Sequence, residues 1–358
     1  MSKINNLDRK KTKIINNLLN RFISDGCFPG AVLAIGDKQD IKFLNAYGYA
    51  SLYPIKEKMT TNKMFDLASL TKVICTTSLV MKSIEEGLLR LDDSISLFIP
   101  SFSNDRITIR HLLTHTAGLP AHKPLYKILA SKNDVIKYIS TIEPEYEPGS
   151  KVVYSDLGFI TLGYIIEKVY HGKLDRLAYE KIFKPLGMKE TIFNPSKKYR
   201  KRCVSTEFCS IRKRYIKGEV HDENAWFMGG VAGHAGLFST ARDLSRFAEM
   251  MLNFGKYRGF SLFSKRTVEI FTTNHTSHLN VNRGLGWLLK NKYCSCGDLM
   301  SDRVFGHTGF TGTSIWIDPV YDVYIILLTN RVHPTRENKC IIRARPLIHN
   351  VIMSQLLD

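Results

Sequence analysis

Two short apolar runs lie close together near the amino terminus, at 31–35 and 41–47, and both predict β-strands. The polar residues 37–40 between them predict a turn. Before the first run, apolar positions over 8–24 follow the period of an amphipathic helix. The chain is therefore expected to open with a helix and two neighbouring strands.

A second helical pattern follows, in which the apolar positions are Leu70, Val73, Ile74, Val80, Met81 and Ile84. This spacing predicts a helix over 69–86, which Gly87 would end. From there to about residue 223, Pro and Gly residues divide the chain into short and mainly helical segments.

Strand patterns return in the last third of the chain. Thr240 is a candidate N-cap for a helix over 241–252, and 340–357 predicts a closing helix. Stretches rich in Val, Ile and aromatic residues predict strands at 304–306, 314–317 and 323–328. Strands at both chain ends predict an α/β (α+β) fold, with an antiparallel sheet flanked by the N- and C-terminal helices and a helical region inserted between its halves.

This order of elements also predicts two domains. Residues 1–66 and 236–358 would form a discontinuous sheet domain, and 67–235 a mainly helical domain that carries the helix beginning at Ser69. We expect the active site at their interface.

The formal net charge is +18, and its densest basic stretch runs over 197–217. No helix-turn-helix, zinc finger or aromatic-studded sheet motif accompanies this charge, so we expect a solvated basic loop and no nucleic-acid partner. Attraction of an anionic small-molecule or peptide substrate is a second role for the charge. The sequence does not indicate an oligomeric state.

No apolar run reaches the roughly 18 residues that cross a bilayer, so we expect no membrane span. Residues 1–18 lack the order of a secretory signal, which favours a cytoplasmic protein; a secreted or cell-envelope protein whose leader was removed would show the same sequence. The 7 scattered cysteines indicate structural or incidental thiols and no disulfide framework.

Ser69 and Lys72 form a Ser-x-x-Lys pair at the start of the predicted 69–86 helix. Residues three apart share a helix face, so the hydroxyl and the ammonium can approach each other. The helix amino terminus favours developing negative charge, and the lysine becomes a base if its pKa falls. Alone, this spacing is also typical of an ordinary helix start with a surface lysine.

Two further stretches carry groups for the same chemistry. Tyr154 follows a Pro-Gly turn, and its phenol can relay a proton if Lys72 lowers its pKa. His307, Thr308 and Gly309 open a late strand pair, where glycine lets a substrate lie close to the strand edge. The alternatives are a packed tyrosine and a surface histidine in a β-turn.

Together, these stretches resemble the three motifs of class C β-lactamases and related penicillin-binding proteins, DD-peptidases, esterases and amidases. The matching segments are Ser69-Leu70-Thr71-Lys72, Tyr154-Ser155-Asp156 and His307-Thr308-Gly309, in the family's order and at similar intervals. The segments 111–120 and 284–287 are also similar to this family. The resemblance covers about 28–330 and implies a β-lactamase/transpeptidase-like fold.

The resemblance also implies roles for the matched positions. Ser69 would be acylated, while Lys72 and Tyr154 would share the proton transfers. The backbone N–H groups of Ser69 and Phe310 would form the oxyanion hole, and Asp156 would contact substrate, as would His307, Thr308 and Gly309.

Two departures from the family's pattern bear on the substrate. Asp156 stands where the family often has Asn, and a carboxylate accepts hydrogen bonds but cannot donate them. His307 replaces a common Lys, so that a titratable group stands where a fixed charge is usual. Both changes make efficient β-lactam hydrolysis unexpected.

A metal or cofactor is not expected. His111 and His115 are four apart, but Leu112 stands where a zinc protease needs glutamate. The neighbours His221, Asp222 and Glu223 would point in different directions on regular structure.

The 218–225 stretch and the Gly-rich 229–236 resemble a subgroup that includes muropeptide amidases. One interpretation is a loop that borders the active site and sets substrate choice; the other is a glycine-rich connection. We therefore expect an acyl-serine hydrolase of cell-wall-derived peptides, either an amidase or a DD-peptidase-like enzyme. The alternatives are a carboxylesterase or weak β-lactamase and, in another class, a non-catalytic muropeptide-binding module.

Overall fold

A seven-stranded antiparallel sheet is the centre of the computed structural model, which describes residues 7–102, 104–279, 281–292 and 294–357. The strands lie in the order β11-β12-β13-β14-β1-β2-β3. Their bounds are β1 Gly30–Gly36, β2 Ile41–Ser51, β3 Glu57–Lys58, β11 Leu288–Leu289, β12 Phe305–Thr308, β13 Thr313–Asp318 and β14 Val323–Thr329. The pairing of β1 with β14 joins the two ends of the chain, so the predicted fold class is confirmed.

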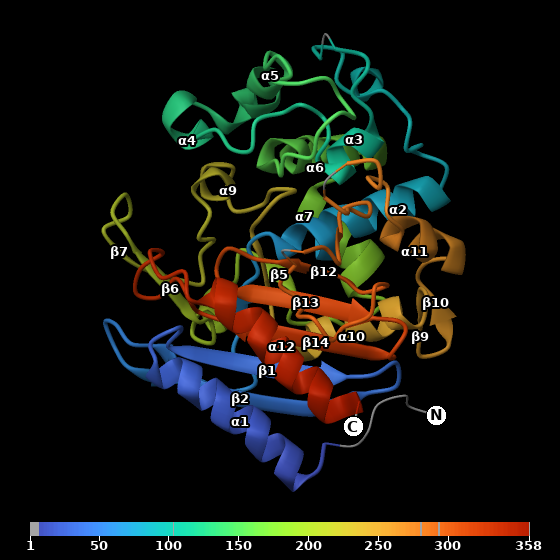
Figure 1. Ribbon diagram of the computed structural model, residues 1–358. Helices are drawn as coiled ribbons and strands as arrows, with labels where there is room; N and C mark the ends of the chain where they lie inside the picture. Colours follow the sequence, from blue (N-terminus) through green and yellow to red (C-terminus); the bar gives the residue numbers. More distant parts are fainter. Residues whose placement is uncertain (1–6, 103, 280, 293, 358) are drawn as a thin grey trace.

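Helices cover both faces of this sheet (Figure 1). On one face lie α1, Arg9–Ser24, and α12, Ile341–Leu357, and on the other face α10, Ala241–Leu252, packs against β1 and β14. Alternate residues of β1 therefore enter different cores: Leu33 packs with the α1 and α12 side, and Val32 with the opposite side. This burial on both faces explains why the strand sequence is continuously apolar.

Most of the remaining helices form a layer above one edge of the sheet (Figure 1). The predicted 69–86 helix is a π-helical segment, Lys72–Thr77, that continues into α2, Ser78–Glu85. The others are α3 Ile109–Thr114, α4 Leu125–Ile128, α5 Val135–Ser140, α6 Asp156–Tyr170, α7 Leu174–Ala178, α8 Lys197–Arg200, α9 Glu223–Phe227 and α11 Lys265–Thr272.

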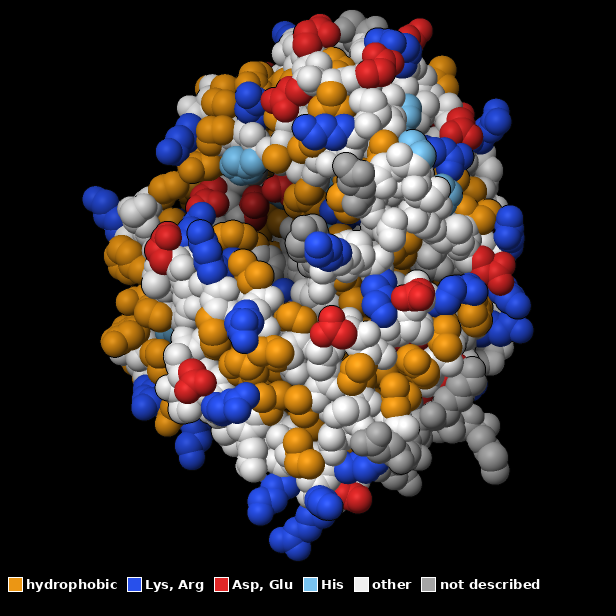
Figure 2. Space-filling view, viewed as in Figure 1, with side chains coloured by type: hydrophobic (Ala, Val, Ile, Leu, Met, Phe, Trp, Pro, Cys, Tyr) orange, Lys and Arg blue, Asp and Glu red, His pale blue; other side chains and the backbone are white. Residues whose placement is uncertain are grey.

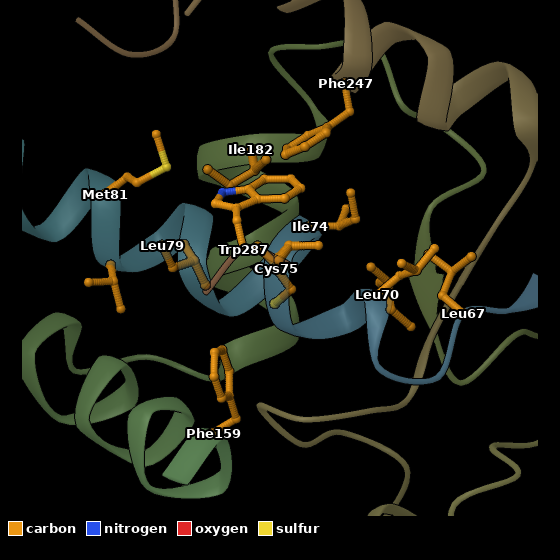
Figure 3. Packing of buried hydrophobic residues seen from close by; sticks show 14 of the residues in the cluster. Leu67, Leu70, Ile74, Cys75, Leu79, Met81, Phe159, Ile182, Phe247 and Trp287 are labelled. Atoms are coloured by element: carbon orange, nitrogen blue, oxygen red, sulfur yellow. The ribbon is translucent and has the colours of Figure 1, made fainter. Parts of the chain in front are cut away.

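The segment that follows Ser69 lies in the largest hydrophobic core of the described residues. Figure 3 shows its Ile74 and Leu79 side chains among residues from other elements, with Trp287 beside Ile182 and Phe247. Burial of this many apolar side chains holds the segment in place, and with it the serine and lysine at its start.

Small strand pairs complete the fold. They are β4 Phe65–Asp66, β8 Leu237–Ser239 and β5 Ile192–Phe193 in one sheet, β6 Ser205–Cys209 with β7 Arg214–Lys217, and β9 Lys256–Tyr257 with β10 Phe260–Ser261. The basic 197–217 stretch is thus α8 and a β-hairpin, where we had expected a loop. Its charges are partly paired, because Arg200 and Arg214 contact Glu219, and Arg202 contacts Glu190.

Cys27 and Cys340 are joined by a disulfide, with their Cα atoms 5.0 Å apart. The expectation of free thiols was therefore wrong for this pair, because residues 313 positions apart meet where the amino-terminal strands approach α12. Within the described ranges, no helix is both long and apolar enough to cross a membrane.

Candidate active site

Ser69, Tyr154 and His307 line one cleft between the sheet and the helical layer. Its cavity volume is about 850 Å³. Figure 2 shows a hollow in the upper half of the molecule, with acidic side chains inside it. The structure therefore brings the three motif segments together at one place, although they are distant in sequence.

The Ser69 hydroxyl and the Lys72 ammonium lie 3.0 Å apart, as their spacing predicts. A tight turn precedes them, in which Ala68 has a φ of 46° and its N–H donates to Asp66 Oδ1 over 2.9 Å. Ser69 remains partly exposed to the cleft, whereas the Lys72 side chain is fully buried. This arrangement leaves the hydroxyl accessible and removes the lysine from solvent.

Lys72 is held by two further acceptors. Its Nζ donates to Asp156 Oδ1 over 2.7 Å and to the His234 carbonyl oxygen over 3.1 Å. Burial alone would lower the pKa of Lys72, but the Asp156 carboxylate and the Tyr154 phenol outweigh burial and raise that pKa. The lowered pKa that would make Lys72 a base is therefore not found, since the ion pair keeps Lys72 as an ammonium.

Tyr154 lies directly before α6 and faces Lys72. The Lys72 Nζ is 4.9 Å from the centre of the Tyr154 ring. Burial raises the pKa of the Tyr154 phenol, while Lys72 and a hydrogen bond with Ser69 act in the opposite direction. The effect of burial is larger than that of the neighbouring cation, so the net shift of the Tyr154 pKa is upward.

The loop that carries Tyr154 is fixed by the 111–120 segment. The His115 carbonyl accepts a hydrogen bond from Val153 N over 2.9 Å, and His115 Nδ1 accepts one from Ser155 N over 3.0 Å. Ser155 Oγ donates to the Pro120 carbonyl over 2.7 Å and also caps α6 by accepting from Gly158 N. The 111–120 segment thus supports the loop that carries the tyrosine.

His307 is almost fully buried on β12, with its ring centre 6.1 Å from that of Tyr154. Nδ1 lies 2.8 Å from the Thr308 carbonyl oxygen, which can only accept, so Nδ1 carries the proton. Nε2 has no hydrogen-bond partner among the described residues. Burial and the Lys72 charge lower the pKa of His307 to about 3, so the side chain is neutral and its Nε2 is an acceptor. A neutral His307 carries no positive charge with which to pair with a substrate carboxylate.

The turn after β12 is tied to the turn before Ser69. Thr313 Oγ1 donates to the Leu67 carbonyl over 3.0 Å. A Cβ on Gly309 would lie 2.2 Å from Thr313 Oγ1 and 2.4 Å from that carbonyl, so only glycine fits. Among the described residues, the backbone N–H groups of Ser69 and Phe310 donate no hydrogen bond, which leaves both available at the cleft.

The 218–225 stretch lies at the cleft, as one of the two interpretations expects. His221, Asp222 and Glu223 are all part of its lining. Asp222 Oδ1 lies 2.9 Å from His234 Nε2, and the carbonyl oxygen of the same histidine accepts a hydrogen bond from Lys72 Nζ. His221 lies 3.0 Å from Glu207 and stacks on Phe310, with 5.6 Å between the ring centres.

Several groups in the cleft were not found by sequence reasoning. His122 Nδ1 lies 3.9 Å from Asp156, and this carboxylate raises the pKa of His122. Arg283 lies over the Tyr154 ring, and its sequence signal was its position directly before the Gly284-Leu285-Gly286-Trp287 segment. Basic residues also line the wall near α12, namely Arg331, Arg336, Lys339 and Arg345. No group of three or more His, Cys, Asp or Glu side chains within the described ranges could hold a metal ion.

The chain matches the Beta-lactamase family over residues 15–347 and belongs to that family. It is 36% identical to an N-acetylmuramyl-L-alanine amidase of Bacillus subtilis (strain 168), over 90% of this chain and 82% of that protein. It is 37% identical to a putative D-alanyl-D-alanine carboxypeptidase of Salmonella enteritidis, over 93% of this chain and 84% of that protein. The protein is therefore a serine hydrolase related to β-lactamases and penicillin-binding proteins.

Solved structures support the same fold. The hydrolase EstCE1, which has promiscuous acyltransferase activity, aligns with a TM-score of 0.78 at 22% identity, covering 96% of this chain and 99% of that one. A penicillin-binding protein homologue from Pyrococcus abyssi aligns with a TM-score of 0.74 at 21% identity, covering 95% of this chain and 77% of that one. These likenesses confirm the β-lactamase/transpeptidase-like fold.

Proposed function

We propose that this enzyme cleaves an amide bond in muropeptides through an acyl-enzyme on Ser69. The observation that carries the proposal is the 3.0 Å contact between Lys72 Nζ and Ser69 Oγ at the floor of a substrate-sized cleft. Similarity to an N-acetylmuramyl-L-alanine amidase over 90% of the chain supports the substrate class. The bond cleaved would join N-acetylmuramic acid to L-alanine.

In the first half of the reaction, Tyr154 is the proposed base, because Asp156 holds Lys72 as an ammonium. The step starts from the phenolate form of Tyr154, which Lys72 favours and burial opposes. The Ser69 proton passes to this phenolate oxygen as Oγ bonds to the carbonyl carbon. The carbonyl oxygen becomes an oxyanion, which would accept hydrogen bonds from the N–H groups of Ser69 and Phe310. Both N–H groups are free of other described acceptors.

In the second half, the intermediate collapses. Tyr154 gives its proton to the amide nitrogen, the C–N bond breaks, and the amine leaves as an acyl ester remains on Ser69. Water then attacks the ester, its proton passes to Tyr154, and the Ser69–acyl bond breaks. Return of the proton to Ser69 regenerates the hydroxyl and releases the acid.

The remaining lining residues would bind the substrate. We assign Thr308, Gly309 and Phe310 to the edge along which the substrate backbone lies. His307 Nε2 would accept a hydrogen bond from an N–H or O–H group, and Asp156 would do the same beside Lys72. The basic wall near α12 supports an anionic substrate.

A second candidate function is D-alanyl-D-alanine carboxypeptidase activity, which the relative from Salmonella enteritidis favours. Both reactions use the same acyl-serine chemistry, but they release different products. The amidase releases a peptide with a free L-alanine amine, whereas the carboxypeptidase releases D-alanine.

The test is mass spectrometry of a muropeptide digest treated with the wild type and with Ser69→Ala. The proposal predicts separation of the saccharide from the peptide by the wild type alone. Release of D-alanine with the saccharide bond intact would favour the carboxypeptidase instead. A parallel assay with a chromogenic cephalosporin is expected to give little turnover, because Asp156 and neutral His307 replace the family's usual Asn and Lys.

A further inference from the structure

Arg283 is a buried arginine in the cleft wall, and its charge has no acidic partner among the described residues. The residue is 6% exposed, and its Nε and Nη1 atoms have no hydrogen-bond partner in the described ranges. A buried charge without a partner carries a large desolvation cost. This cost indicates that the guanidinium pairs with an anion at some stage of the catalytic cycle.

The backbone around Arg283 places the side chain firmly. Its N–H donates to Thr276 Oγ1 over 2.8 Å, and its carbonyl accepts from His275 N over 2.8 Å. The next residue is Gly284, where a Cβ would lie 2.6 Å from the Phe271 carbonyl oxygen. The close approach that this glycine allows fixes Arg283 over the cleft.

The group that Arg283 faces is Tyr154. The guanidinium carbon lies 5.6 Å from the centre of the Tyr154 ring, and Lys72 Nζ lies 4.9 Å from the same centre. Two cations therefore flank one phenol, and only one of them, Lys72, is paired with a carboxylate among the described residues.

We propose that Arg283 is a positioning residue that stabilises the ionised form of Tyr154, so that this phenolate can accept the Ser69 proton while Lys72 remains an ammonium. The proposal rests on the acyl-serine mechanism given above. The Tyr154 phenolate would then be the anion that pairs with the guanidinium. Burial alone disfavours this ionised form of the tyrosine. Burial lowers the pKa of Arg283 to about 10, so the side chain still carries its charge at neutral pH.

Other groups near Tyr154 do not supply this charge. The ring centres of His115 and His307 lie 4.5 Å and 6.1 Å from that of Tyr154. Burial lowers the pKa of both histidines, and both are neutral near pH 7. The Asp156 carboxylate acts against ionisation of Tyr154.

The experiment is the pH dependence of kcat/KM for p-nitrophenyl acetate, a neutral ester that offers no carboxylate to Arg283. We expect Arg283→Met to lower kcat/KM by about tenfold or more and to move the acidic limb up by about one pH unit, because the phenolate becomes harder to form. Arg283→Lys keeps the charge and is expected to restore most of that shift. Arg242→Met, on the exposed side of α10, is the control and should match the wild type.

An acidic limb that stays in place in Arg283→Met would overturn the proposal, and so would a loss confined to KM for anionic substrates. If Arg283→Met does not fold, Arg283→Gln is compared with Arg283→Lys, and equal limbs in these two variants also overturn it. The Ser69→Ala variant tests the acyl-serine mechanism separately from the role of Arg283. Ester hydrolysis at the wild-type rate in Ser69→Ala contradicts the acyl-serine mechanism, whatever Arg283 does.

Discussion

The buried Lys72 ammonium and the partly exposed Asp156 carboxylate form an ion pair of 2.7 Å, and the same nitrogen lies 3.0 Å from Ser69 Oγ. The carboxylate thus fixes the lysine as a hydrogen-bond donor and cation beside Ser69. This pairing is the reason why we propose Tyr154, and not Lys72, as the base. It also makes the charge state of Lys72 depend on a residue 84 positions away.

Asp156→Asn is expected to bring a basic limb of the pH–activity profile down toward neutral pH. In the wild type the raised pKa of Lys72 keeps the ammonium charged through the alkaline range. Without the carboxylate, burial lowers that pKa, and the cation beside Tyr154 is lost as the pH rises. The measurement is kcat/KM between pH 6 and about pH 10; identical basic limbs in variant and wild type would contradict the ion-pair argument.

Lys72→Met is expected to lower kcat by about 10³-fold, because removing the cation leaves the Tyr154 phenol without its closest stabilising charge. Steady-state kinetics with a p-nitrophenyl ester measure this loss. The control is Lys13→Met on α1, which is exposed and far from the cleft. Retention of more than a tenth of wild-type kcat in Lys72→Met would show that the lysine is dispensable.

Gly309→Ala is expected to lower activity by about 10²-fold or more. The added Cβ would approach Thr313 Oγ1 and the Leu67 carbonyl to 2.2 and 2.4 Å, so the turn and its Phe310 N–H must move. Gly158→Ala in α6 is the matched control, because its Cβ meets nothing closer than 3.6 Å. Kinetics and thermal melts of both variants test the prediction, and a fully active Gly309→Ala would contradict the assigned oxyanion hole.

His307 is expected to remain a neutral imidazole with the proton on Nδ1 down to about pH 5. The physical cause is burial, which lowers its pKa to about 3, together with the 2.8 Å hydrogen bond to the Thr308 carbonyl. NMR of the ¹⁵N-labelled imidazole between pH 8 and pH 5 measures both the tautomer and the charge, with His307→Gln to assign the signal. An imidazolium spectrum at pH 6 would contradict it.

Glu249 on α10 is expected to make the protein less stable as the pH rises. Burial raises the pKa of Glu249 to about 7 in the folded state, above the unfolded value near 4.5. The protonated carboxyl therefore favours the folded state at low pH, and this contribution to stability is lost as the pH rises from about 4.5 through 7. Glu249→Gln keeps a hydrogen-bonding group beside Tyr324 without the charge. Urea unfolding at pH 5 and pH 8 should show the wild type losing about 2 kcal/mol more than the variant; equal losses would show that Glu249 is not protonated in the folded state.

The sequence predicted the elements whose pattern is local. The 8–24 and 340–357 helices are confirmed as α1 and α12, and Thr240 caps α10 by accepting a hydrogen bond from Asp243 N. Ser69 and Lys72 also meet as predicted, since a three-residue spacing fixes their geometry within one turn.

Long-range contacts could not be predicted in the same way. The pKa of Lys72 depends on Asp156, and the burial of Arg283 over Tyr154 depends on two loops that meet only in the fold. Spacing along the chain contains no information on these distances. The neutral state of His307 was missed for the same reason, because strand pairing and not local sequence buries it.

The most direct test of acyl-enzyme formation on Ser69 is covalent labelling of the wild type with a fluorophosphonate, followed by intact-mass and peptide mass spectrometry. We expect one adduct, located on Ser69, that is absent from Ser69→Ala and forms far more slowly in Lys72→Met and Tyr154→Phe. An adduct on another residue, or equal labelling of Ser69→Ala, would contradict it.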